Sequence, residues 1–126
     1  MKKLFTIICL LILSSNSYSE EISGDQVEIK KNGLVYETNS DTPFTGTVVW
    51  FQKDGKLVLR DNYQEGVQDG LYESFYENGQ LYVKRNYKDG EVDGPYEWFY
   101  ENGQLEEIKY FIKGTEVRRR QYLRSR

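Results

Sequence analysis

The chain has 126 residues, about one domain's worth, and its 17 Lys and Arg against 20 Asp and Glu give a formal net charge of -3. It contains no histidine, which excludes Ser-His-Asp triads, Cys-His dyads and histidine-based zinc or haem sites. Aromatic residues make up 15% of the chain and include 11 tyrosines, a composition typical of folded rather than disordered proteins.

Residues 1–19 are predicted to be a secretory signal peptide. Lys2 and Lys3 give a basic start, residues 4–13 form an uncharged apolar run, and a polar stretch with small residues extends to Ser19. The apolar run is about half as long as the roughly 20 residues that a membrane-spanning helix needs. We therefore expect cleavage near Ser19 and a periplasmic or extracellular protein. An uncleaved membrane anchor is the alternative.

The single cysteine and the charge distribution fit this expectation. Cys9 lies inside the apolar run rather than at its end after a small residue, so we expect it to leave with the signal peptide rather than carry a lipid. Residues 20–117 contain ten Lys or Arg and all twenty acidic residues, and a cationic segment follows them. An acidic body repels phosphates and anionic membrane surfaces, so we expect no nucleic-acid partner.

A 24-residue repeat organises most of the chain. Three ungapped copies cover residues 46–69, 70–93 and 94–117, and the last two share Tyr-Glu-x-Phe-Tyr-Glu-Asn-Gly-Gln-Leu. A fixed period of this length indicates a repeat array, in which each unit needs its neighbours to bury a face.

Each copy contains a hairpin signature, an Asp-Gly or Asn-Gly pair between two runs rich in aromatic and β-branched residues. Such pairs favour the type I′ turn, in which both central residues have positive φ. We therefore predict six structural turn residues: Asp54, Gly55, Asn78, Gly79, Asn102 and Gly103.

Counting outward from these turns predicts the strand register. It places Trp98 opposite Glu107, and it places each repeat glycine opposite an aromatic ring. The further predicted pairs are Trp50–Leu59, Ser74–Val83, Gly46–Tyr63, Gly70–Tyr87 and Gly94–Phe111. Alternation then assigns Leu57, Leu81 and Leu105 to the face of Trp98, and assigns Phe51, Phe75, Phe99 and the Glu73–Lys84 pair to the other face.

These signals predict an all-β fold, an elongated and twisted antiparallel β-meander built from tandem 24-residue β-hairpin repeats over residues 44–117. Six repeat strands are expected, and helix is disfavoured because glycine recurs about every twelve residues. Residues 20–43 are predicted to form an N-terminal capping segment with a degenerate hairpin around Asn32-Gly33. Residues 118–126 are predicted to form an Arg-rich C-terminal tail.

The repeat also resembles a known family. The pattern Gly-x-Tyr-x-x-Phe-Tyr-x-Asn-Gly-Gln-Leu, followed by Tyr-x-x-Gly-x-x-x-Gly, is similar to the bacterial variant of the MORN repeat over residues 44 to about 117. Bacterial proteins of this kind are often labelled antitoxin-like, and other MORN arrays are credited with membrane or protein attachment. The resemblance therefore implies an interaction module, and it carries over no catalytic constellation.

Five aromatic residues are candidate binding residues, because Tyr and Trp dominate the hot spots of protein interfaces. The alternative is that these rings cover one face of the sheet and form its core. Trp98 is the sharpest candidate, since its counterparts in the other copies are Trp50 and Ser74. The full set is Tyr72, Tyr76, Tyr96, Trp98 and Tyr100.

Repeated carboxylates suggest a second class of site. Glutamates two or four residues apart on one strand suit glycoside hydrolysis or a hard cation. Catalytic residues are normally singular, however, whereas these recur with the repeat, so we predict no catalytic residue, no metal and no cofactor. The glutamates are Glu73, Glu77, Glu97 and Glu101.

Arg118, Arg119 and Arg120 permit two interpretations. Arginines on a terminal strand protect its edge from aggregation. Alternatively they attach the protein to anionic lipid or to an acidic partner, and we expect any membrane contact to pass through them.

The sequence therefore predicts an exported, non-enzymatic MORN-repeat protein that acts as a protein-interaction module, with another protein as its partner. One alternative is an antitoxin or immunity-like protein that neutralises a toxin. The other is an exported carbohydrate-active hydrolase that uses the repeat glutamates.

Overall fold

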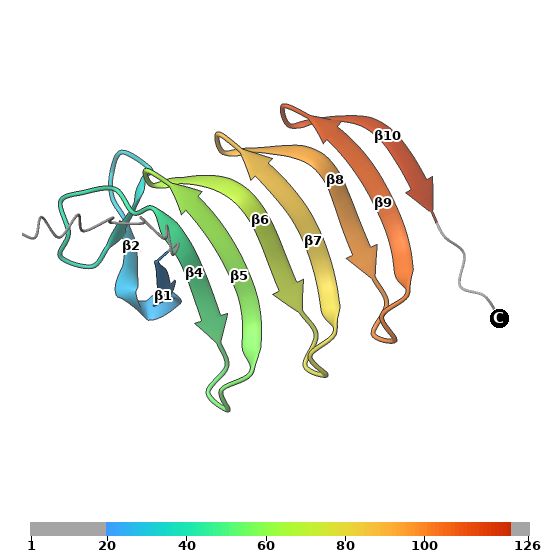
Figure 1. Cartoon of the computed structure of the whole chain (residues 1–126), viewed down its shortest axis with the longest axis horizontal. Coiled ribbons are helices and arrows are strands. Elements are labelled where there is room, and N and C mark those ends of the chain that lie inside the picture. Colours follow the sequence, from blue (N-terminus) through green and yellow to red (C-terminus); the bar gives the residue numbers. More distant parts are fainter. Residues whose placement is uncertain (1–19, 122–126) are drawn as a thin grey trace, which may run out of the picture.

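The computed structural model describes residues 20–121, and within this range the protein is almost entirely β-structure. Eight strands form one sheet in the order β1-β4-β5-β6-β7-β8-β9-β10 (Figure 1). From β4 onward every strand is antiparallel to its neighbours, whereas β1 pairs with β4 in parallel. The predicted all-β meander is confirmed.

The main sheet has two strands more than the six expected, because β1 pairs with β4 at one end and β10 continues the meander through the three arginines at the other. Its strands are β1 (Glu21–Ser23), β4 (Gly46–Phe51), β5 (Leu57–Gln64), β6 (Val67–Phe75), β7 (Leu81–Lys88), β8 (Glu91–Phe99), β9 (Leu105–Ile112) and β10 (Thr115–Gln121). The N-terminal segment adds the short 3-10 helix η1 (Gly24–Gln26) and an antiparallel pair, β2 (Val27–Ile29) and β3 (Val35–Glu37).

The turns at the Asp-Gly and Asn-Gly pairs are not of type I′. In the second copy Tyr76 N donates to Gln80 O at 2.8 Å, and Gly79 N donates to Tyr76 O at 2.9 Å, which closes a three-residue loop. Gly79 has a φ of 84°, but Asn78 is not among the described residues with positive φ. This is the loop in which a left-handed glycine follows a type I turn. The expectation of positive φ at Asn78 was wrong.

Turns with positive φ at both central residues occur instead at the links between the hairpins. At the second link Asp89 has a φ of 51° and Gly90 a φ of 82°, between the paired residues Lys88 and Glu91. These two-residue loops have the conformation that the type I′ turn requires. They connect the strands at the end opposite to the Asn-Gly turns (Figure 1). The other two are Glu65-Gly66 and Lys113-Gly114.

The predicted cross-strand pairs are nevertheless confirmed, including Trp98–Glu107 and each pairing of a repeat glycine with a ring. The loop at each Asp-Gly or Asn-Gly turn has one residue more than the predicted two-residue turn. The strand that follows also contains one extra residue beside the turn, as the register shift between Ser74 and Phe75 shows, so the pairs farther from the turn are as predicted. Close to the turn the prediction fails, because Leu81 pairs with Phe75 and so shares its face.

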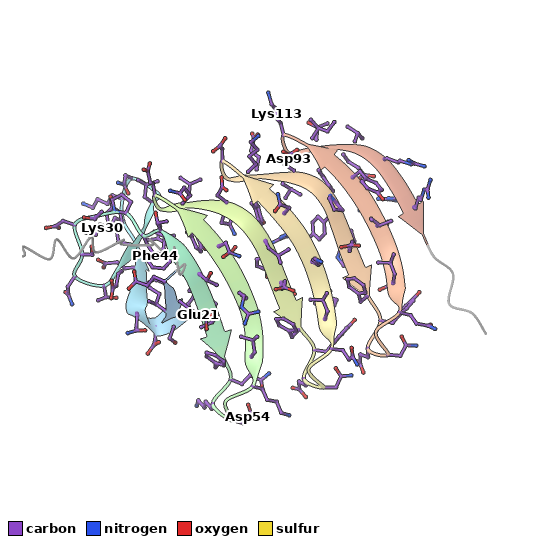
Figure 2. All side chains as sticks on the ribbon, viewed as in Figure 1. Glu21, Lys30, Phe44, Asp54, Asp93 and Lys113 are labelled. Carbon is purple, nitrogen blue, oxygen red and sulfur yellow. The ribbon has the colours of Figure 1, made fainter. Side chains whose placement is uncertain are left out.

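The hydrophobic core lies at the N-terminal end of the sheet. Ile22, Val35, Phe44 and Val48 are buried together, and Figure 2 shows Phe44 between the N-terminal segment and β4. Backbone hydrogen bonds fasten this segment to the first link, since Val35 N donates to Gly66 O and Gly66 N donates to Phe44 O. Beyond β5 the described sheet is a single layer whose side chains are mostly half-buried.

Candidate functional site

A row of aromatic and cationic side chains crosses the single-layer part of the sheet. The register pairs Tyr72 with Arg85, Arg85 with Tyr96, and Tyr96 with Lys109. Directly paired residues point to the same face, and Trp98 follows Tyr96 on that face at a spacing of two. We call these five residues the aromatic row: Tyr72, Arg85, Tyr96, Trp98 and Lys109.

Arg85 is held among three tyrosine rings. Its guanidinium carbon lies 4.2 Å from the centroid of the Tyr72 ring and 5.0 Å from the centroids of Tyr87 and Tyr96. Arg85 Nη1 also donates a hydrogen bond of 2.7 Å to the Tyr96 hydroxyl. A planar guanidinium favours such contacts with ring faces. The row is therefore fixed in place by its own members.

Tyr96 and Trp98 form a stacked pair at the centre of the row. Their ring centroids are 3.9 Å apart and their planes differ by 12°. Lys109 Nζ lies 5.1 Å from the centroid of the Trp98 ring, which adds a second cation. Both rings are half-buried, so part of this stack faces solvent.

The remaining candidate rings, Tyr76 and Tyr100, lie next to the Asn-Gly turns rather than in the row. The Tyr76 ring packs against Tyr82 with centroids 4.8 Å apart, and its hydroxyl donates to Phe99 O at 2.7 Å. Burial, and secondarily Tyr82, raises the pKa of Tyr76. Tyr100 is half-buried at the same position of the next repeat. The structure thus brings together three of the five predicted residues.

Asp61 extends the row at the end near the hydrophobic core, where it pairs with Tyr72. Its side chain is buried, and Oδ2 accepts hydrogen bonds from the Tyr63 hydroxyl at 2.9 Å and from Gln68 Nε2 at 2.7 Å. Burial raises the pKa of Asp61 despite these hydrogen bonds, and burial together with Asp61 raises the pKa of Tyr63. A buried carboxylate therefore marks the boundary between core and row.

The sequence prediction missed Arg85 and Lys109 of the aromatic row, and Asp61 next to it. The signal was present, because the register that correctly paired Trp98 with Glu107 also places Arg85 opposite Tyr72. A search limited to recurring aromatic residues overlooked it, since positions 61, 85 and 109 hold Asp, Arg and Lys in the three copies.

The repeat glutamates fall into two separate groups. Glu73 and Glu97 both pair with Lys84, and Glu73 lies 3.7 Å from Arg60, so they belong to a row of alternating charge on the opposite face. Glu77 and Glu101 are exposed at the turns. Across residues 20–121 no group of three or more acidic, His or Cys side chains is arranged to hold a metal ion.

The three arginines lie on β10, the last strand of the sheet. Arg119 contacts Glu107 at 3.1 Å and Glu116 at 3.5 Å. Within the described part of the chain, no helix is long and apolar enough to cross a membrane.

Comparison with known proteins supports the repeat assignment. A family model described as a MORN repeat variant matches residues 68–89 and 92–113, which span β6 to β9 and the link between the two hairpins. Searches of curated proteins and of solved structures gave no match. The matched segments contain all five residues of the aromatic row, including the Tyr96–Trp98 stack. Residues 68–89 and 92–113 are therefore similar to MORN repeats, in line with the repeat read from the sequence.

Proposed function

We propose that the protein is an exported, non-enzymatic interaction module that binds another protein through the aromatic row. MORN repeats generally serve as modules for interaction with proteins or membranes. The sheet offers a protein a long, gently curved face, and the two matched repeats place Tyr72, Tyr96 and Trp98 on it.

The observation that carries this proposal is the Tyr96–Trp98 stack with a cation on each side, Arg85 on β7 and Lys109 on β9. Tyr, Trp and Arg are the residue types that most often supply binding energy at interfaces, while a polar surround excludes water. Arg85 already holds Tyr72 and Tyr96 in place through its ring contacts and its hydrogen bond. A partner that docks there meets rings that lose little conformational entropy on binding.

Of the two alternative functions, only the antitoxin or immunity role would use the aromatic row. An antitoxin or immunity protein is one form of the same module, in which the bound partner is a toxin. The hydrolase receives no support from the geometry, since Lys84 lies between Glu73 and Glu97 and the remaining glutamates occupy turns.

Affinity capture from the cell envelope tests the proposed surface. Three baits are compared, namely wild type, the double variant Tyr96→Ala/Trp98→Ala, and Phe51→Ala, which removes an exposed ring from the other face. We expect wild type and Phe51→Ala to retain the same protein, and the double variant to retain at least about tenfold less of it. Equal retention by all three folded baits would contradict the proposal.

The export part of the proposal has its own test, because the predicted signal peptide lies outside the described residues. N-terminal sequencing of the protein from the envelope fraction should give a chain that starts at or near Glu20. An intact Met1 on protein found in the cytosol would contradict export without affecting the proposed surface.

A further inference from the structure

The terminal strand β10 presents a free edge within the described sheet. It is the last strand in the order and pairs only with β9. The strand is seven residues long, and its side chains from Thr115 to Arg120 are exposed. The opposite edge strand β1 has three residues and leads directly into η1. One edge of the sheet thus carries a long row of backbone donors and acceptors without a neighbouring strand.

Positive charge is concentrated on this edge. Arg118 and Arg120 pair with Tyr110 and Ile108 of β9 and therefore share a face, and neither forms an ion pair within residues 20–121. Arg119 points to the other face, where Glu107 and Glu116 partly neutralise it. Among the described residues, no acidic side chain lies within ion-pair distance of either of these two cations.

We propose that the β10 edge binds an acidic, extended segment of another protein by strand addition. Backbone hydrogen bonds along β10 supply the pairing, and Arg118 and Arg120 select carboxylates on the added strand. This site is separate from the aromatic row, and the proposal does not depend on it.

Charge discriminates against the other occupants of this edge. A second copy of β10 in antiparallel register would bring the arginines of both copies against each other, and like charges directly opposite are destabilising. A nucleic acid or an anionic membrane matches the arginines but offers no strand to pair with. The acidic body behind β10, with twenty carboxylates and ten cations in residues 20–117, also repels polyanions.

A peptide titration tests the proposal on the full chain. The probe is a peptide of about nine residues that alternates Thr with Glu, so that its carboxylates share one face of a strand. Two N-methylated forms keep its charge. One is methylated at every second residue, which leaves one edge with its N–H groups, and the other is methylated at every residue, which leaves none.

We expect the first methylated form to bind within about threefold of the parent peptide and the second to bind at least tenfold more weakly, because only the second cannot form a strand pair. The variant Arg118→Gln/Arg120→Gln should also bind the parent peptide at least tenfold more weakly. The control variant Lys31→Gln/Lys53→Gln loses the same charge at two exposed sites away from β10 and should bind normally.

Three results would overturn the proposal. The first is no binding of the parent peptide at millimolar concentration. The second is equal binding of the fully methylated form, which would reduce the interaction to charge alone. The third is tighter binding of single-stranded DNA or of vesicles containing phosphatidylserine than of the peptide, which would assign the arginines to a different class of partner.

Discussion

Trp50 and Trp98 occupy the same position in two repeats, yet the two ends of the sheet use them differently. The Trp50 ring lies directly against Gly24 of η1, so closely that a Cβ at that glycine would overlap the indole. The Trp98 ring stacks on Tyr96 of its own strand and has Lys109 near it. Trp50 therefore contacts the N-terminal segment although it stays 44% exposed, whereas Trp98 is half-buried and belongs to a surface that no second layer covers within residues 20–121.

The two ends of the array also differ in how deeply their side chains are buried. At the N-terminal end η1, β2 and β3 add a second layer that buries Phe44 and Val48. In the later repeats each strand contacts mainly its two neighbours, as in other repeat proteins, and rings and cations remain half-exposed. The N-terminal end therefore contributes the packed core, while the later repeats leave the aromatic row partly exposed, where we propose that a partner binds.

The largest expected effect comes from removing the centre of the core. Phe44 is 4% exposed, and Phe44→Ala should lower the free energy of unfolding by about 3–4 kcal/mol, through lost burial and the cavity left behind. Tyr96→Ala in the single-layer region should cost clearly less. Urea denaturation of both variants measures this, and a Tyr96→Ala loss as large as that of Phe44→Ala would remove the distinction between the two regions.

A matched pair of glycines sharpens the comparison. Gly66 and Gly114 lie in the same kind of turn, with φ of 81° and 77°. A Cβ at Gly66 would lie 2.9 Å from Leu34 Cβ and Val35 O, whereas a Cβ at Gly114 would lie 3.9 Å from Glu91 Cβ. Alanine at either position should cost roughly 1–2 kcal/mol for backbone strain. Gly66→Ala should cost about 1–2 kcal/mol more, because the N-terminal segment must move. Equal losses in denaturant titrations would mean that the segment does not pack on this link.

The smallest expected effect concerns Asp61, at the boundary between the two regions. Burial raises its pKa above the ordinary 3.8, so the ionised form is less favourable in the folded state than in the unfolded state. The loss of stability caused by ionising Asp61 is therefore absent below pH 3.8 and grows as the pH rises through the pKa of the folded state. The free energy of unfolding of Asp61→Asn, minus that of wild type, should therefore become more positive over this rise in pH. A difference that moves the other way would show that hydrogen bonds and Arg85 outweigh burial.

Much of the single-layer region could be predicted from the sequence, because the repeat fixes local rules that recur. The 24-residue period and the glycine-ring pairs indicated the meander and its register. The turn type was wrong because Asn-Gly also suits a three-residue loop with glycine in the left-handed conformation. The predicted register away from the turns was still correct, because the one-residue register shift beside each turn offsets the extra residue in the loop.

The N-terminal region was much less predictable. The parallel pairing of Ile22 with Val48 and the contact between Trp50 and Gly24 depend on tertiary packing, and neither leaves a periodic pattern in the sequence. The candidate site lies between these cases. Tyr72, Tyr96 and Trp98 were predicted from the repeat. Arg85 could be found only by combining the predicted register with the observation that this repeat position holds an arginine in one copy alone.

We propose that Trp98 contributes to partner binding, whereas Trp50 holds the N-terminal segment against the sheet. The most direct test of this proposal measures partner affinity and melting temperature for Trp98→Ala and Trp50→Ala, with the protein captured from the envelope as the titrant. We predict that Trp98→Ala weakens binding by at least about 1–2 kcal/mol and keeps a folded domain, and that Trp50→Ala lowers the melting temperature more and binding less. The account would be contradicted if Trp98→Ala left binding unchanged, or if it unfolded the protein as severely as Phe44→Ala.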